Sequence, residues 1–309
     1  MPRCAASAPA AILFALLLAL LCAVAPSVHA APSDASADAP ASFDPASAYV
    51  YVPPSLADSS RPAQVVFALH GMGGDGKGFG QALLGAADRE GWVVVAPTFS
   101  YRNWRDPAVV AADDIALTRG LVDLLDQLPD RIGRPVDSKA VVLGFSRGAQ
   151  LAHRFAETYP DRTRAAVVMS AGSYTVPRLV DARGAPLPFP FGMADLSERS
   201  GHPVDAGALE AVPFWVAVGG NDNNPGDVPR QWDGLVGTSR LERARAFVRL
   251  LKASGASATL NVFSNTGHEV TPDMFRGAVD FLRQATAQPS AIGVASLSGF
   301  GALRTPLAI

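Results

Sequence analysis

The segment Gly144-Phe145-Ser146-Arg147-Gly148 constrains the fold of this chain more than any other feature. An apolar run over residues 140–144 precedes the turn, and a helical pattern over residues 147–159 follows it. A sharp turn from a buried strand into a helix needs small residues on both sides, and the two glycines supply them. Such a turn lifts the serine hydroxyl above the edge of a sheet, so Ser146 is the candidate nucleophile.

Short apolar runs and helical patterns alternate along the rest of the chain. The other runs that predict strands cover residues 49–52, 65–69, 92–96, 165–169, 214–218 and 259–263. They lack alternating polar residues, which is typical of parallel strands buried on both faces. Further helical patterns cover residues 108–128, 239–254 and 273–285. This alternation predicts one α/β domain over residues 46–286, with a mostly parallel, doubly wound sheet.

Residues 171–212 interrupt this rhythm with five prolines and several glycines. An insertion of this length is often a lid or a binding region, and the alternative is a surface excursion without a role. We expect Phe189, Phe191, Met193 and the later Trp232 to line an acyl or aromatic pocket, although apolar residues in such loops more often only pack.

The two ends of the chain predict export and loose segments. Arg3, an apolar run over residues 10–24 and small residues before Ala31 predict a signal peptide over residues 1–30. An uncleaved anchor and a lipidated Cys22 are the alternatives. Residues 31–45 are expected to be a linker, and residues 287–309 a flexible tail. The mature protein would be secreted or periplasmic, without a stable membrane anchor.

Charge and cysteine content exclude some classes of site. The chain has 26 Lys+Arg and 28 Asp+Glu, a net charge of −2, whereas surfaces that bind nucleic acid are usually basic. We therefore expect no nucleic-acid partner. Cys4 and Cys22, the only cysteines, both fall in the predicted signal peptide. A thiol nucleophile or a thiolate metal site is then not available to the mature chain.

A serine hydroxyl needs a base, and histidine is the usual one. Of the five histidines, His268 lies after the last predicted strand and directly before a helix, where a base would hang over the edge of the sheet. Where the catalytic residues occur along the chain in the order serine, acid and histidine, the acid follows the strand before the one that leads to the histidine. Asp222 comes directly after residues 214–218, so it is the first candidate, and Asp227 is the alternative.

The segment Leu69-His70-Gly71-Met72-Gly73-Gly74 follows an early predicted strand. Its backbone can supply one donor of an oxyanion hole, and the amide after the nucleophile supplies the other. The candidates are the amides of Met72 and Arg147, with Gly73 as the alternative to Met72. Gly71, Gly73 and Gly76 also match a dinucleotide-binding pattern, but the next strand ends without the acidic residue that such a site uses.

These residues together resemble the α/β-hydrolase superfamily. The chain is more narrowly similar to secreted esterases of the polyhydroxybutyrate depolymerase and feruloyl or acetylxylan esterase group. That likeness adds the segments Tyr49–Pro53, Asp114-Ile115 and Asn265–His268 to the motifs above, and it covers roughly residues 45–285. Esterases of this group often have Asn or Gln where this chain has Arg147, and many of them use cysteines that it lacks.

The resemblance implies a serine hydrolase that cleaves small or polymeric carboxylic esters through an acyl-enzyme, with a triad of Ser146, His268 and Asp222. This chemistry needs neither a cofactor nor a metal ion. The alternatives are a peptidase, thioesterase or lipase on the same fold, and a binding protein without activity.

Overall fold

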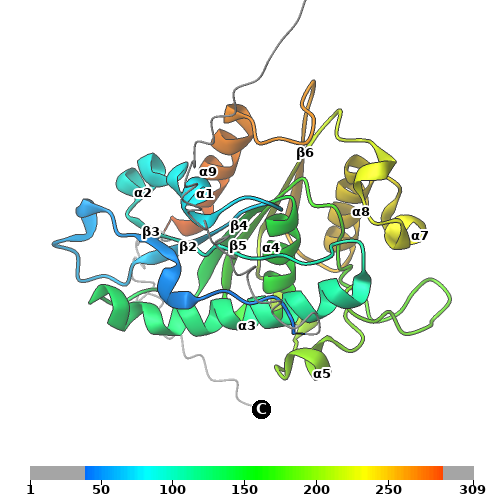
Figure 1. The fold of residues 1–309 in the computed structure, drawn as a ribbon, viewed down its shortest axis with the longest axis horizontal. Coiled ribbons are helices and arrows are strands. Elements are labelled where there is room, and N and C mark those ends of the chain that lie inside the picture. The colour runs from blue at the N-terminus through cyan, green and yellow to red at the C-terminus, as the bar shows by residue number, and fades with distance from the viewer. Residues whose placement is uncertain (1–38, 288–309) are drawn as a thin grey trace, which may run out of the picture. The chain divides into compact units, whose positions relative to one another are not determined.

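A seven-stranded sheet forms the centre of the fold (Figure 1). The computed structural model describes residues 39–287, and all elements named below belong to the second of two units, residues 40–309. The strands are β1 (Tyr49–Tyr51), β2 (Gln64–Leu69), β3 (Trp92–Ala96), β4 (Ala140–Phe145), β5 (Thr163–Met169), β6 (Phe214–Gly219) and β7 (Ala258–Phe263).

The strands pair in the order β1-β3-β2-β4-β5-β6-β7. Only β1 runs antiparallel to its neighbour, and the other five pairings are parallel. The strand order reverses beside β2, so the crossover helices fall on both faces of the sheet. The predicted mostly parallel, doubly wound sheet is confirmed.

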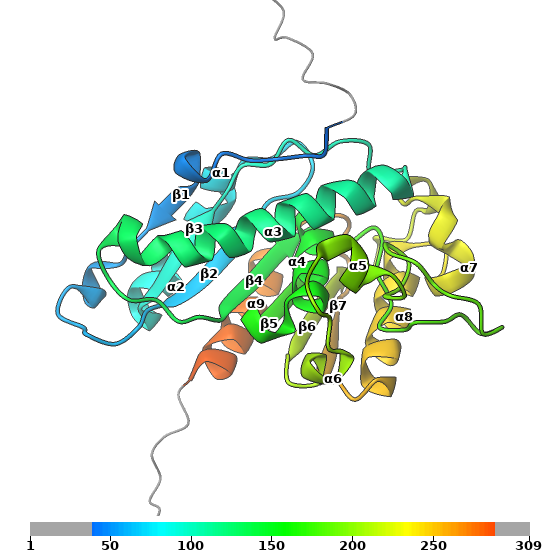
Figure 2. The same cartoon turned by 90° about the horizontal axis from the view of Figure 1, so that it is seen from below.

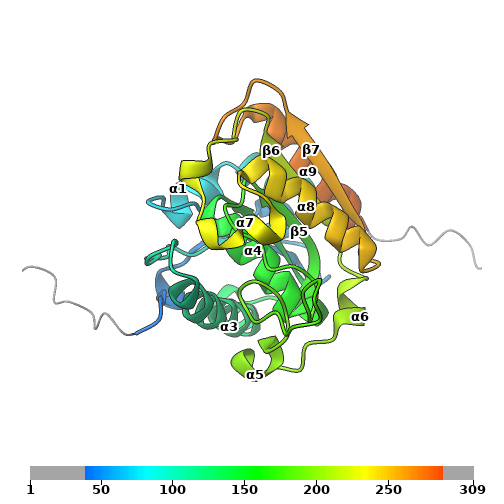
Figure 3. The same ribbon diagram turned by 90° about the vertical axis from the view of Figure 1, so that its right-hand side faces the viewer.

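Helices cover both faces, and alternate strand residues point to each face. One core packs α3 (Pro107–Ile132), α4 (Arg147–Thr158) and α8 (Arg240–Ala253) on the sheet. The opposite core packs α2 (Leu84–Glu90) and α9 (Pro272–Thr286) on the sheet, and Figures 2 and 3 show α9 across the sheet from α3. The shorter helices are α1 (Gly76–Gln81), α5 (Leu196–Ser200), α6 (Ala206–Leu209) and α7 (Asp233–Val236).

The four predicted helices all form, with small changes at their ends. α3 is longer than the spacing predicts, because Asp106 caps it at Ala108 N, Pro107 occupies its first turn, and Gly133 ends it with a φ of 66°. The short helices α1, α2, α5, α6 and α7 were not predicted. Five 3-10 helices complete the described chain: Pro45–Ser47, Pro54–Leu56, Pro160–Arg162, Pro225–Asp227 and Arg230–Trp232.

The described end of the expected linker packs against the domain. The Ala41 amide donates to Asp113 Oδ1 over 2.8 Å, and the Phe43 ring makes an edge contact with Phe99. Burial of the Phe43 ring favours this packing, and the hydrogen bond to Asp113 satisfies the Ala41 amide that is buried with it. The predicted signal peptide and nearly all of the predicted tail lie outside the described residues. Among residues 39–287, no helix combines the length and apolar character that crossing a membrane requires.

Candidate active site

Ser146 occupies the turn between β4 and α4 in a strained conformation, with φ 54° and ψ −114°. Its amide donates to Met169 O over 2.9 Å, which ties the turn to the end of β5. A Cβ atom on Gly144 would collide with the Gly148 carbonyl, and one on Gly148 would collide with the Leu69 carbonyl. Both glycines of the motif are therefore required by close backbone approach, as the sequence predicts.

The structure brings Ser146, His268 and Asp222 into one chain of hydrogen bonds. His268 Nε2 lies 2.9 Å from Ser146 Oγ, and His268 Nδ1 lies 2.8 Å from Asp222 Oδ2. The three residues follow β4, β7 and β6, so the carboxyl ends of parallel strands place them together. The Phe145 ring stacks on the His268 ring with centroids 4.9 Å apart, which holds the imidazole plane.

The alternative acid, Asp227, borders the same cavity but makes no hydrogen bond to His268. Its side chain is exposed and accepts a hydrogen bond from Asn224 Nδ2, and its carbonyl accepts one from Arg240. Between the two candidates, only Asp222 contacts the histidine.

Asp222 is buried, and Arg240 Nη1 donates to its second oxygen over 2.9 Å. Burial alone would raise the pKa of Asp222, but the hydrogen bond to His268 and the charge of Arg240 outweigh burial and lower it. The carboxylate therefore stays ionised, and it can hold a proton on His268 Nδ1 while Nε2 faces the serine as an acceptor.

The predicted oxyanion donors border the same cavity as Ser146 and His268. Residues 71–74 form a turn that is closed by the Gly74 amide and the Gly71 carbonyl, with Gly73 at a φ of 74°. His70 supports this turn, since its Nδ1 lies 2.7 Å from Gly71 O and its Nε2 accepts from the Phe99 amide over 2.9 Å. Burial lowers the pKa of His70, which favours the neutral ring that these two bonds need.

The side chain of Arg147 has a role that the motif did not predict. It is buried, donates to Asp114 Oδ1 over 2.6 Å and lies over the Tyr101 ring. Asp114 Oδ2 accepts from Arg154 over 2.6 Å, so one carboxylate of α3 holds two arginines of α4. Burial alone would lower the pKa of Arg147, but attraction to Asp114 outweighs burial and raises it. These ion pairs hold α4, which follows the nucleophile, against α3.

The cavity beside Ser146 has a volume of about 290 Å³. Its lining includes the serine, the histidine, both oxyanion candidates and Trp104, which sequence reasoning missed. Three further lining residues that it missed are Gln150, Gly172 and Arg240. No local pattern marks these three, because they come from α4, from the loop after β5 and from the start of α8. Gly172 is the contribution of the 171–212 insertion to this lining. Within the described part of the chain, no group of three or more His, Cys, Asp or Glu side chains is arranged to hold a metal ion.

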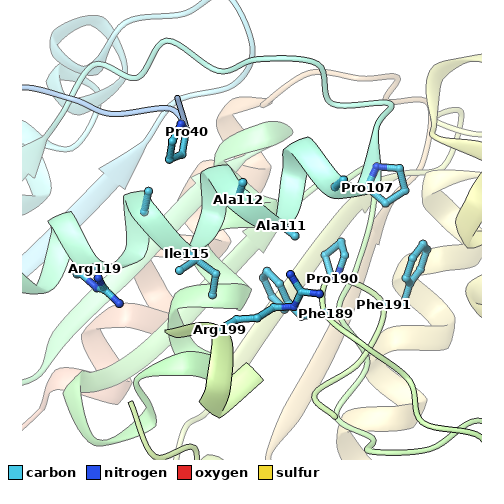
Figure 4. Close-up of a pocket in the computed structure, with 12 residues that line it drawn as sticks. Pro40, Pro107, Ala111, Ala112, Ile115, Arg119, Phe189, Pro190, Phe191 and Arg199 are labelled. Atoms are coloured by element: carbon cyan, nitrogen blue, oxygen red, sulfur yellow. The ribbon is translucent and has the colours of Figure 1, made fainter. Parts of the chain in front are cut away.

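The expectation that Phe189, Phe191, Met193 and Trp232 line an acyl or aromatic pocket is wrong for the cavity beside Ser146, which none of them borders. Trp232 is fully buried, donates to Tyr174 O over 2.8 Å and packs on Phe191. Phe189 and Met193 pack with Ala111 of α3, in a separate apolar cluster. Figure 4 shows Phe189 and Phe191 at a different cavity of about 590 Å³, which α3 borders. Phe189 and Met193 are thus buried in a cluster with α3, and Trp232 is buried in a second cluster against the half-buried Phe191.

Comparison with known proteins identifies the fold. No protein-family model matches the chain, and no curated protein matches its sequence. It is similar to the solved structure of poly(aspartic acid) hydrolase-1 from Sphingomonas sp. KT-1, with 22% identity, a TM-score of 0.57, and coverage of 75% of this chain and 91% of that one. It is also similar to esterase PE8, with 19% identity, a TM-score of 0.50, and coverage of 80% and 99%. The chain has the α/β-hydrolase fold, as its resemblance predicted.

Proposed function

We propose that this protein is a serine hydrolase that cleaves carboxylic esters through an acyl-enzyme. The observation that carries the proposal is the hydrogen-bonded chain from Ser146 Oγ through His268 to Asp222, at 2.9 and 2.8 Å. A serine hydroxyl with a histidine acceptor at this distance is activated for attack on a carbonyl carbon.

The steps follow from these contacts. As Ser146 Oγ attacks the ester carbonyl, His268 Nε2 takes the hydroxyl proton, and Asp222 stabilises the imidazolium that forms. The amides of Met72 and Arg147 donate to the negative oxygen of the tetrahedral intermediate. His268 then returns the proton to the departing alcohol, which leaves an acyl group on Ser146. Water, deprotonated by His268, releases the acid and restores the serine.

The test is hydrolysis of p-nitrophenyl acetate, butyrate and octanoate by the protein and its Ser146→Ala variant. We expect turnover by the wild type and a loss of about 10⁶-fold in kcat in the variant, as for the nucleophile of other triads. A fluorophosphonate that labels wild type and not the variant would place the reactive hydroxyl at residue 146. An unlabelled wild type without turnover would contradict the proposal and favour a binding protein.

We also propose that the protein is exported and processed near Ala30, on the pattern of residues 1–30. Mass spectrometry of the mature N-terminus tests this, and a retained leader or a lipidated Cys22 would contradict it. Among esters, the resemblance to polyhydroxybutyrate depolymerases and feruloyl esterases makes hydroxybutyrate oligomers and feruloyl esters the first candidates for a wider panel.

A further inference from the structure

Gln150 presents a hydrogen-bond donor close to the nucleophile. It lies one helical turn after Ser146 on α4, lines the cavity beside the serine and is 4% exposed. Its Oε1 accepts from Ser173 Oγ over 3.0 Å and lies 3.5 Å from Arg154 Nη1. Because arginine has donors and no acceptor, the atom that faces Arg154 must be the amide oxygen. The amide nitrogen Nε2 is therefore turned away from this network, toward Gly172.

Gly172 places no side chain against that nitrogen. A Cβ atom at this position would lie 3.2 Å from Gln150 Nε2 and 3.7 Å from Arg240 Nε. Gly172, Gln150 and Arg240 all line the cavity that Ser146 borders. A side chain at residue 172 would thus crowd Gln150 Nε2 and contact Arg240 Nε, and glycine keeps it away from both donors.

Arg240 contributes positive charge and a donor without an acceptor. Its Nη1 donates to Asp222 and its Nη2 to Asp227 O, while its buried Nε has no hydrogen-bond partner within the described part of the chain. The carboxylate of Asp227, which also lines the cavity, accepts from Asn224. Gln150 Nε2 and Arg240 Nε therefore present two nitrogen donors on this side of the cavity.

We propose that Gln150, Gly172 and Arg240 form a subsite that binds a free carboxylate of the substrate. This inference rests on the proposed ester hydrolysis and names its substrate class: esters that carry a carboxylate close to the scissile bond. A carboxylate offers only acceptors, and its hydrogen bonds to amide and guanidinium donors are stronger than those of a neutral group. Gln150 follows Ser146, the N-cap of α4, by four positions, which corresponds to about 6 Å along a helix axis. A spacer of three methylenes has about this length.

The substrates that test this subsite are monoethyl glutarate, its carboxamide isostere ethyl glutaramate, and the matching branched alkyl ester. A charge-assisted hydrogen bond predicts a kcat/KM about 10- to 100-fold higher for the carboxylate than for the carboxamide. Equal rates for these two esters would overturn the proposal, since the subsite would then bind any acceptor. A preference for the alkyl ester would overturn it as well.

Two variants locate the subsite. Gln150→Glu keeps an oxygen toward Arg154 and Ser173 but turns a second oxygen toward Gly172. The ratio of kcat/KM for the carboxylate ester to kcat/KM for the carboxamide ester should therefore fall to about 1 or below. Gly172→Ala places a methyl group beside both donors and should lower the same ratio about tenfold, with no change of charge. The matched control is Gln284→Glu on the exposed side of α9, which should leave the ratio unchanged. A preference that survives both substitutions, in variants whose urea unfolding matches the wild type, would overturn the assignment.

A binding measurement separates failure of the subsite from failure of the proposed function. Isothermal titration of Ser146→Ala with monoethyl glutarate and with ethyl glutaramate needs no turnover. One outcome is that the wild type hydrolyses no ester, while Ser146→Ala binds monoethyl glutarate more tightly than ethyl glutaramate and loses this difference in affinity when Gln150→Glu is added. In that case the subsite is supported and the esterase proposal fails. If neutral p-nitrophenyl esters are hydrolysed but neither glutarate ester binds better than the other, the subsite fails and the esterase proposal stands.

Discussion

Asp114→Asn should destabilise the protein and slow the reaction, although residue 114 does not line the cavity beside Ser146. Both carboxylate oxygens of Asp114 accept from arginines at 2.6 Å, and all three side chains are buried. An asparagine can keep one acceptor, but its NH₂ must then face a guanidinium that has no lone pair. Arg154 would retain its bonds to Thr175 and Ser173, whereas Arg147 would keep only its contact with the Tyr101 ring.

The cost follows from leaving a buried cation without its partner. Breaking one side of a buried ion pair typically costs 3–5 kcal/mol, so we expect the free energy of unfolding to fall by about 3 kcal/mol or more. Urea unfolding at neutral pH measures this value. Because Arg147 also bears a predicted oxyanion amide, a displacement of about 1 Å would lower kcat by about 10²-fold. Steady-state hydrolysis of p-nitrophenyl butyrate measures that loss.

The neighbouring Asp113→Asn is the matched control. Asp113 Oδ1 accepts from the Ala41 amide over 2.8 Å and from Arg102 Nε over 2.7 Å, so an asparagine can retain both bonds through its own oxygen. Asp113 Oδ2 accepts a longer bond, 3.4 Å, from the Arg102 amide. The side chain of Arg102 is 25% exposed, and a pair that reaches solvent is worth about 1 kcal/mol or less. Equal losses in the two variants, or a loss below 1 kcal/mol in Asp114→Asn, would refute the reasoning.

Two further predictions concern the acid and a buried histidine. Asp222→Asn should lower kcat about 10⁴-fold in the p-nitrophenyl assay, because an amide nitrogen facing His268 Nδ1 favours the wrong tautomer; a loss under tenfold would contradict this role. Burial and the charge of Arg154 lower the pKa of His153 well below its usual value, while the unfolded chain binds that proton below about pH 6.5. Stability should therefore fall as the pH drops below about 6.5, by about 1.4 kcal/mol per pH unit for this group, until its folded pKa is reached. His153→Gln should show a shallower fall in urea unfolding between pH 7 and 5, and parallel curves would contradict the prediction.

The sequence by itself determined the fold class and the order of the site residues along the chain. Short apolar runs that break at Gly, Pro or Ser marked the strand ends, and parallel strands present their carboxyl ends at one edge of the sheet. The glycines around Ser146 marked a close backbone approach before any contact was known. Local pattern and chain order were therefore enough to select Ser146, Asp222 and His268, which the structure then brought within hydrogen-bond distance.

Tertiary structure alone decided which side chains surround that chain of bonds. Gln150, Gly172 and Arg240 belong to three separate segments, and nothing in their local sequence distinguishes them from ordinary surface or loop residues. The apolar residues of the insertion were misassigned for the same reason, since an apolar side chain can bury itself against any neighbour that offers a surface. The periodicity of apolar residues predicts which face of a helix or strand is buried. The residues that pack on that face come from distant segments, and no local pattern encodes them.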